Sequence, residues 1–341
     1  MIELIESWMV LNGWTMAAAI IVGFLLLIYG ADWLVDGSSA LAKRFGVSSL
    51  VIGLTVVAFG TSMPEFIVST IAALENNTEI AITNILGSNS INTLIILGCT
   101  ALIYPVASQA SCRKFDIPLS LLAGILVLFL ATYIPPMEWS LHDWGTFSLT
   151  SGAITRWGGI LLLLFFISFM GHNIRVAKQN KTEEKEEKTP MPVWKMLLLI
   201  VIGLLGLVCG GECVVRGATG AAQALGVSDA VIGLTVVALG TSLPELATSC
   251  IAAAKKNCDL ALGNVIGSNI FNVFFILGTG AVIHPLPSYQ GMWLDAAMVI
   301  VGSLLVMAFV YLNKQHQIRR WHGALMIAVY AAYLTYRLMT C

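Results

Sequence analysis

The chain has 341 residues, of which 57% are hydrophobic and only 11% are charged. Soluble globular proteins have about 25% charged residues, so this composition excludes that class and indicates an integral membrane protein. The formal net charge is −1 and no basic stripe is present, which excludes a protein built to bind nucleic acid.

The N-terminal segment "MIELIESW" has two glutamates and no basic residue, so we do not expect it to be a cleavable signal peptide. After it, apolar runs indicate ten membrane-spanning helices, because one span needs about 20 apolar residues. In the first half the runs cover residues 15–35, 49–74, 80–104, 117–135 and 156–174. In the second half they cover residues 195–215, 229–254, 260–284, 292–312 and 322–339.

A charged run, "AKQNKTEEKEEKTPMP" at residues 177–192, separates the two halves. It has no apolar face and is typical of a solvated linker. The predicted organisation is therefore a first five-helix unit at 1–176, a linker at 177–192 and a second five-helix unit at 193–341.

The two units are copies of each other. When the sequence is shifted by 180 positions, residues 51–105 match residues 231–285 without a gap, with 30 identities in 55 positions. Because each unit has an odd number of spans, the second must enter the membrane from the opposite side. The predicted fold is an all-α polytopic membrane protein with ten transmembrane helices arranged as two inverted five-helix repeats.

The distribution of basic residues predicts the orientation of the chain. With both termini outside, 15 of the 18 Lys and Arg residues lie in cytoplasmic loops, and the outside has only Arg156, Arg216 and Arg337. We therefore expect the 177–192 linker to be cytoplasmic and the protein to lie in the plasma (inner) membrane.

The most strongly duplicated segments, "VIGLTVVAFGTSMPEF" at 51–66 and "VIGLTVVALGTSLPEL" at 231–246, combine a helix breaker with polar groups. Pro64 clashes with the carbonyl of Gly60, so the helix must kink or break. Freed backbone groups at membrane depth are tolerated only inside protein or along a cavity. Thr61 and Glu65 lie four residues apart on one face, and oxygen ligands of this kind bind hard cations such as Ca²⁺ and Na⁺. The second copy has the corresponding Thr241, Ser242, Pro244 and Glu245.

The next predicted helix of each half has a second motif, "GSNSIN" at 87–92 and "GSNIFN" at 267–272. Ser88 and Asn92 lie four residues apart, as do Ser268 and Asn272, and each pair offers a hydroxyl and an amide oxygen. We expect the two broken helices and the two flanking helices to form one central site with two carboxylates. Four other duplicated side chains are interpreted as helix ties that point away from it: Asn84, Asn89, Asn264 and Asn269.

The four motifs "GTSMPE", "GSNSIN", "GTSLPE" and "GSNIFN", in this order, resemble the paired alpha-repeats of the sodium/calcium exchangers, in the calcium:cation antiporter superfamily. The resemblance covers nearly the whole chain and implies a Ca²⁺ antiporter driven by Na⁺ or H⁺, working by alternating access. The side-chain cation ligands that it implies are Thr61, Ser62, Glu65, Ser88, Asn92, Thr241, Ser242, Glu245 and Ser268. Ala58 and Ala238 match positions where the family uses backbone carbonyls.

One position departs from the family. Where the family often has Asp, this chain has Asn272, which we include in the predicted ligand set as a neutral oxygen donor. The change removes one possible negative charge and argues against co-transport of K⁺. The expected partners are the transported ions Ca²⁺ and Na⁺ (or H⁺) and the lipid bilayer; we expect no enzymatic activity, no cofactor and no protein partner.

Three alternatives remain at this point. A Ca²⁺/H⁺ antiporter would have the same fold, because a carboxylate binds either Na⁺ or H⁺. An intramembrane serine protease using Ser62 or Ser242 is disfavoured, because no histidine lies in the middle of a span to act as the base. A channel is disfavoured because paired broken helices with carboxylates suit a bound-ion intermediate better.

Overall fold

The computed structural model describes residues 13–133, 152–179, 191–226, 238–289 and 291–340. In the first half the elements are α2 (Gly13–Phe45), α3 (Ser49–Ile52), the π-helical turn η1 (Gly53–Val57), α4 (Ala58–Thr61), α5 (Met63–Leu74), α6 (Thr78–Ile91), the π-helical turn η2 (Asn92–Ile96), α7 (Leu97–Ile103), β1 (Val106–Ala107), the π-helical turn η3 (Cys112–Asp116), α8 (Ile117–Tyr133), β2 (Ala153–Ile154) and α9 (Arg156–Gln179).

The second half follows a similar order from residue 193 onward, although the residues equivalent to η3 belong to an α-helix there. Its elements are α10 (Val193–Ala224), α12 (Ala238–Thr241), α13 (Leu243–Ala254), α14 (Cys258–Ile270), the π-helical turn η5 (Phe271–Leu277), α15 (Gly278–Ile283), β3 (Leu286–Pro287), α16 (Met292–Leu312), β4 (Gln317–Ile318) and α17 (Arg320–Thr340).

Within these described ranges, seven helices are long and apolar enough to cross a bilayer, and the bent run 49–74 makes an eighth if it counts as one span. The remaining two predicted spans stay predictions. The span at 229–254 is described only from residue 238, where the shorter apolar helix α13 follows. The span at 322–339 coincides with α17, which is long enough but less apolar than the others. The linker lies mostly outside the described residues, although α9 continues to Gln179.

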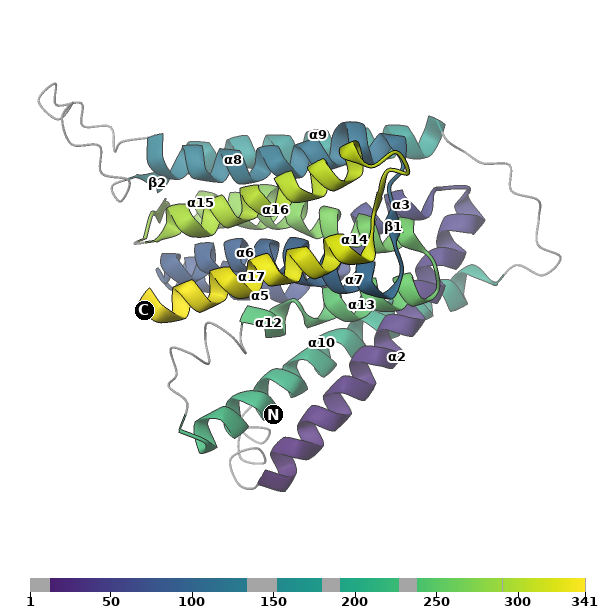
Figure 1. Ribbon diagram of the computed structural model, residues 1–341, viewed down its shortest axis with the longest axis horizontal. Coiled ribbons are helices and arrows are strands. Elements are labelled where there is room, and N and C mark those ends of the chain that lie inside the picture. The colour runs from purple at the N-terminus through teal and green to yellow at the C-terminus, as the bar shows by residue number, and fades with distance from the viewer. Residues whose placement is uncertain (1–12, 134–151, 180–190, 227–237, 290, 341) are drawn as a thin grey trace, which may run out of the picture.

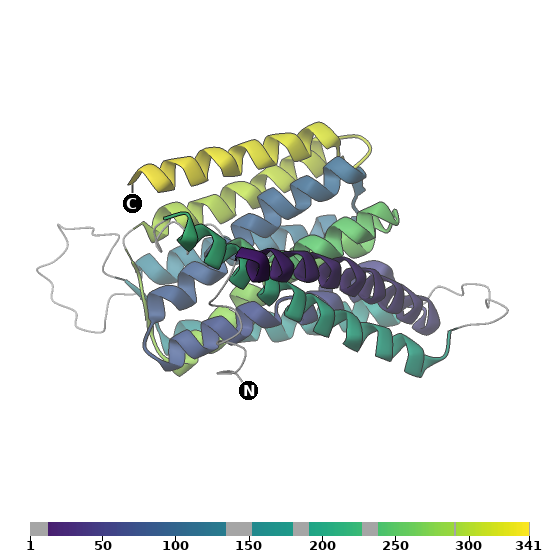
Figure 2. The same ribbon diagram turned by 90° about the horizontal axis from the view of Figure 1, so that it is seen from below.

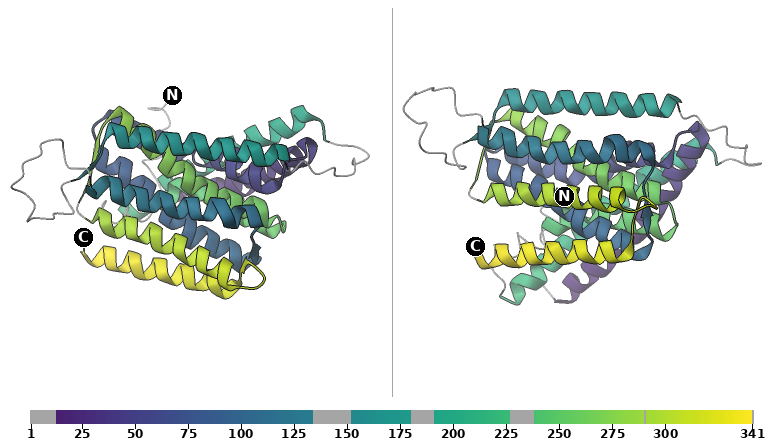
Figure 3. Two further views of the ribbon diagram at one scale, coloured as in Figure 1. Left: turned by 90° about the horizontal axis from the view of Figure 1, so that it is seen from above. Right: turned by 45° about the horizontal axis from the view of Figure 1, so that its top comes forward.

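The helices form a bundle of roughly parallel rods, crossed on one side by the tilted pair α2 and α10 (Figures 1 and 2). At the centre lie the continuous runs 78–103 and 258–283, which are the most buried of the long helices. Figure 3 shows the bundle from two further sides, with α8, α9, α16 and α17 running alongside each other. The core is therefore built around the two helices that contain the second motif of each half.

The α2–α10 pair packs through glycines. A Cβ atom on Gly30 would lie 2.9 Å from the carbonyl oxygen of Gly203, and one on Gly203 would lie 2.7 Å from that of Gly30. Gly23 and Gly210 meet in the same way at another point of the same helix pair, where the corresponding distances from Cβ to carbonyl oxygen would be 2.7 and 2.8 Å. Small residues allow helix backbones in a membrane to approach this closely, so the two longest helices pack as one unit.

Two short antiparallel ribbons lie at opposite ends of the bundle (Figure 1). One pairs β1 with β4 and the other pairs β2 with β3. The strands β1 and β3 are equivalent under the shift of 180 residues. Equivalent segments of the two halves thus lie at opposite ends of the molecule.

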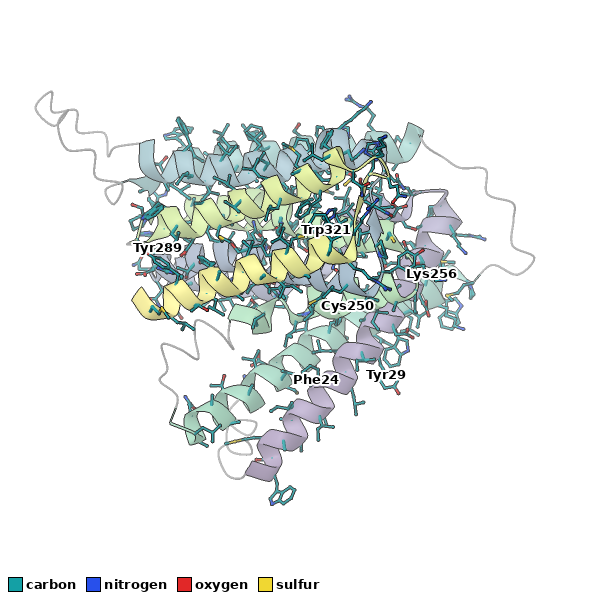
Figure 4. The ribbon with its side chains drawn as sticks, viewed as in Figure 1. Phe24, Tyr29, Cys250, Lys256, Tyr289 and Trp321 are labelled. Atoms are coloured by element: carbon teal, nitrogen blue, oxygen red, sulfur yellow. The ribbon has the colours of Figure 1, made fainter. Side chains whose placement is uncertain are left out.

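The outer surface of the bundle is apolar. Phe24 and Tyr29, labelled in Figure 4, project from α2 and are 48% and 56% exposed. Large exposed apolar side chains also cover α9 and α10, among them Leu164, Ile167 and Leu205. Such a surface would aggregate in water but is the expected exterior of a protein surrounded by lipid.

Candidate functional site

Both copies of the first motif interrupt a helix at a serine. In the first half α4 ends at Thr61, α5 begins at Met63, and the helical axis bends by 50°. Ser62, between them, has φ −83° and ψ 9°. In the second half Ser242, with φ −90° and ψ 5°, separates α12 from α13. The predicted breaks are therefore confirmed, and a proline stands in the first turn of each following helix, where its missing N–H costs nothing.

The break puts each glutamate at a helix N-terminus in the interior of the protein. Glu65 and Glu245 lie in the first turns of α5 and α13, and both are 0% exposed. The partial positive charge of a helix N-terminus stabilises a carboxylate. A buried carboxylate nevertheless needs hydrogen bonds or a counter-ion, so the contacts of these two groups determine what the site binds.

One oxygen of Glu65 accepts hydrogen bonds from both halves of the chain. Its Oε1 accepts from Ser88 Oγ on α6 at 3.3 Å and from Ser242 Oγ at the other break, also at 3.3 Å. Ser88 and Ser242 are 1% exposed, so both hydrogen bonds form away from solvent. The glutamate of the first half is thus joined to the helix break of the second half.

Glu245 has the reciprocal contacts. Its Oε1 accepts from Ser62 Oγ at 2.9 Å and from Ser268 Oγ on α14 at 3.5 Å. Each serine at a break therefore donates to the glutamate of the opposite half, and each serine of the second motif donates to the glutamate of its own half. The six side chains form two hydrogen-bonded groups of three, and each group contains one glutamate, one serine of the same half and one serine of the opposite half.

Five buried oxygens of the predicted ligands have no hydrogen-bond partner in the described parts of the chain: Glu65 Oε2, Glu245 Oε2, Thr241 Oγ1, Asn92 Oδ1 and Asn272 Oδ1. Buried polar atoms without a partner are rare because each costs about 1–3 kcal/mol. Carboxylate, hydroxyl and amide oxygens are the ligands of hard cations. In the same ranges no group of three or more His, Cys, Asp or Glu could hold a metal ion, so neutral oxygens would have to supplement the two carboxylates.

Thr61 and Ala58 line the first break differently. Thr61 Oγ1 lies 3.1 Å from the carbonyl of Val57 and 3.1 Å from Asn264 Oδ1, and its single proton serves one of them at a time. The carbonyl of Ala58 accepts the N–H of Ser62 at 3.0 Å, so one of its two lone pairs is already used. Ala238 opens α12 directly after residues 227–237, which lie outside the described ranges.

Two asparagines hold the glutamates in place, and the sequence interpretation assigned them only to helix packing. Asn84 Nδ2 donates to the carbonyl of Glu65 at 3.3 Å and to Ser69 Oγ at 2.8 Å. In the second half Asn264 Nδ2 donates to the carbonyl of Glu245 and to Ser249 Oγ at 3.0 Å. They do tie helices together, but the prediction that they point away from the site is wrong, because they fix the backbone of the two glutamates. The sequence signal that could have revealed this role is the recurrence of both asparagines at a spacing of 180 residues.

The family model for sodium/calcium exchanger proteins matches residues 15–175 and 195–339, which include every residue of this site. The chain belongs to the sodium/calcium exchanger family. The chain is 36% identical over 318 residues to the putative antiporter CaxA of Alkalimonas amylolytica, covering 92% of this chain and 96% of the relative. It is 32% identical over 338 residues to the sodium/calcium exchanger MaX1 of Methanosarcina acetivorans, with the same coverage.

The fold of the chain also matches solved structures. The sodium-calcium exchanger NCX_Mj, soaked with Na⁺ and Sr²⁺, superimposes with a TM-score of 0.78 and 34% identity, covering 95% of this chain and 99% of NCX_Mj. Members of this family are membrane transporters. The serines at the breaks thus belong to a transporter's polar site, and the serine-protease alternative loses its basis.

Proposed function

We propose that the chain is a secondary active antiporter that exchanges Ca²⁺ for Na⁺ across the membrane by alternating access. The main support is the pair of buried glutamates, each with one oxygen bonded to serines of both halves and one oxygen without a partner. Two carboxylates shared between two broken helices provide one site that both halves can reshape together.

The proposed cation ligands are the side-chain oxygens of the two motifs in each half together with two backbone carbonyls. They are Ala58, Thr61, Ser62, Glu65, Ser88 and Asn92 in the first half, and Ala238, Thr241, Ser242, Glu245, Ser268 and Asn272 in the second. The hydroxyls that now donate to Glu65 and Glu245 also have lone pairs, which they would turn toward a cation.

Charge balance supports exchange without K⁺. If both glutamates are ionised and Asn92 and Asn272 are neutral, the ligand set has two negative charges. One Ca²⁺ or two Na⁺ cancel them. Adding K⁺ beside Ca²⁺ would leave one positive charge with no third carboxylate to offset it, and uncompensated charge is expensive in a low-dielectric site.

Ca²⁺/H⁺ exchange by the same fold is the second candidate. The glutamates that would bind Na⁺ can also take up protons, and the geometry of the ligands is compatible with both. Sodium is favoured because the relatives MaX1 and NCX_Mj, at 32–34% identity, are sodium/calcium exchangers.

We further propose that the ten helical runs are ten spans in two inverted repeats, with both termini outside and the 177–192 linker cytoplasmic, in the plasma membrane. The opposite placement of β1 and β3 supports the inversion (Figure 1). A single cysteine introduced at residues 180–188 of a cysteine-free variant should react with an impermeant thiol reagent only after the cells are opened. Labelling of intact cells would reverse the orientation.

The function is tested by ⁴⁵Ca²⁺ uptake into proteoliposomes containing the purified chain. An outward Na⁺ gradient should drive uptake, whereas a pH gradient alone should not, and external K⁺ should have no effect at saturating Ca²⁺. Uptake driven only by the pH gradient would assign the chain to Ca²⁺/H⁺ exchange. Uptake that requires K⁺ would refute the charge argument.

A further inference from the structure

The side chain of Asn89 has only one possible orientation. It is 1% exposed on α6, and its Nδ2 donates to the backbone carbonyl of Asn269 on α14 at 3.2 Å. A carbonyl oxygen only accepts hydrogen bonds, so the amide nitrogen of Asn89 must face α14. Its Oδ1 must then face the opposite way, where it can only accept.

The orientation of Asn272 follows from that of Asn89. Asn272, which is 0% exposed in η5, donates from Nδ2 to Asn89 Oδ1 at 3.0 Å. Because its nitrogen is used on that side, its Oδ1 points away from Asn89, and this oxygen is one of the five buried atoms without a partner. A fixed backbone carbonyl thus sets the direction of a predicted ligand through one intermediate side chain.

The asparagine of the first half that corresponds to Asn272 is not held in this way. The counterpart of Asn89 is Asn269, whose Nδ2 donates to Thr93 Oγ1 at 2.7 Å instead. The counterpart of Asn272 is Asn92, and neither its nitrogen nor its oxygen has a hydrogen-bond partner among the described residues. The two equivalent asparagines are therefore held differently, with only Asn272 locked.

We infer that Asn89 is a positioning residue, which locks the amide of Asn272 with its oxygen toward the transported cation. This rests on the proposed function, since it assumes that a cation binds between the two glutamates. Without Asn89, the amide of Asn272 could rotate and present its N–H₂ group, which repels a cation. The same contact makes position 272 selective for an amide, because a carboxylate there would place one of its oxygens against Asn89 Oδ1, with two acceptors facing each other.

The test is a double-mutant cycle on equilibrium ⁴⁵Ca²⁺ binding to the purified full-length chain. Asn89→Ala should weaken Ca²⁺ binding by about 10–100-fold, the usual effect of removing a group that orients a metal ligand. In an Asn272→Ala background, where no amide is left to orient, the same change should have no further effect. Equal losses in both backgrounds would show that Asn89 only supports helix packing, and would overturn the inference.

Asn269→Ala is the matched control. It removes an equivalent buried amide but keeps the backbone carbonyl to which Asn89 donates, so its effect on Ca²⁺ affinity should be several-fold smaller than that of Asn89→Ala. An equal effect would also overturn the inference. If Asn89→Ala is not recovered as a monodisperse protein, Asn89→Ser replaces it, because its short hydroxyl cannot reach both partners.

The two levels of the hypothesis fail differently. A wild-type chain that binds no Ca²⁺ would overturn the proposed function together with this inference. A wild-type chain that binds Ca²⁺ with an affinity insensitive to Asn89→Ala would overturn the role of Asn89 alone.

Discussion

The two halves of the chain have the same polar residues around the site but do not make the same contacts. The serines obey the repeat: Ser62 donates to Glu245, and Ser242 donates to Glu65. The threonines do not, because Thr61 contacts Asn264 whereas Thr241 Oγ1 has no partner in the described ranges. The groups that share the charge are thus symmetric, while the groups around them are not.

A second difference lies at the end of the site helices, away from the glutamates. Lys255, directly after α13, forms ion pairs with Asp32 and Asp36 of α2 at 2.7 and 2.6 Å. The corresponding position of the first half is Glu75, and the counterparts of the two aspartates, Glu212 and Arg216, pair with each other on α10. These ion pairs therefore tie α2 to the end of α13 in the second half.

These differences show that the two halves are equivalent in the serine contacts of their glutamates but not in the groups around them. In the proposed inverted repeat, such an inequality would open the shared site toward one side of the membrane at a time. Mutations at equivalent positions of the two halves are the natural way to separate the symmetric part of the site from the asymmetric part.

The largest effect is expected at the glutamates, where the halves are most alike. Glu65→Gln and Glu245→Gln should each reduce Na⁺-driven Ca²⁺ uptake to background, because each removes one of the two charges that balance Ca²⁺. Glu75→Gln is the control, since Glu75 is an exposed glutamate at the end of the same helix α5. Substantial uptake by either site variant would contradict a shared site.

A smaller effect is expected at the serines of the breaks. Ser62→Ala and Ser242→Ala should each weaken Ca²⁺ binding by about 10–100-fold, the equivalent of roughly 1.5–3 kcal/mol for a hydrogen bond to a charged group. Ser62→Ala should have the larger effect, because its bond to Glu245 is 2.9 Å long and that of Ser242 to Glu65 is 3.3 Å. A large effect of one serine with none of the other would show that only one glutamate binds the ion.

The smallest effect is expected at Lys255. Burial disfavours its charged form, but the hydrogen bonds and charges of Asp32 and Asp36 outweigh burial and raise the pKa of Lys255. The side chain remains 32% exposed, so Lys255→Gln should lower the free energy of unfolding by less than about 1 kcal/mol. Thermal unfolding in detergent measures this, with the exposed neighbour Lys256, labelled in Figure 4, as the control in Lys256→Gln. Equal shifts of the unfolding temperature in both variants would show that the ion pairs of Lys255 do not stabilise the fold.

The sequence predicts the polar centre of the site well, because a proline, a glutamate and two hydroxyls recur together where only apolar residues are otherwise tolerated. It does not predict which half each serine contacts, since residue types cannot tell the two glutamates apart. Nor does it predict the π-helical turns that begin at Asn92 and include Asn272, because tertiary packing decides between the two helix types.

Helix lengths were also underestimated from the sequence. The apolar runs 15–35 and 195–215 correspond to helices that continue to Phe45 and Ala224. Hydropathy ends a span at its first polar residues, whereas backbone hydrogen bonding continues as long as the polar side chains find partners. In α2 those partners include Lys255, which lies 219 residues beyond Asp36. Hydropathy over a short stretch of sequence cannot predict a partner so far along the chain.

The central claim is that the glutamates of both halves bind the same Ca²⁺ ion. Equilibrium binding of ⁴⁵Ca²⁺ to the purified chain, measured as ions bound per polypeptide, tests it most directly. We predict one ion per wild-type chain, and none at the same concentration for either Glu65→Gln or Glu245→Gln. Two ions per wild-type chain, with one lost in each single variant, would mean two independent sites and would contradict this account.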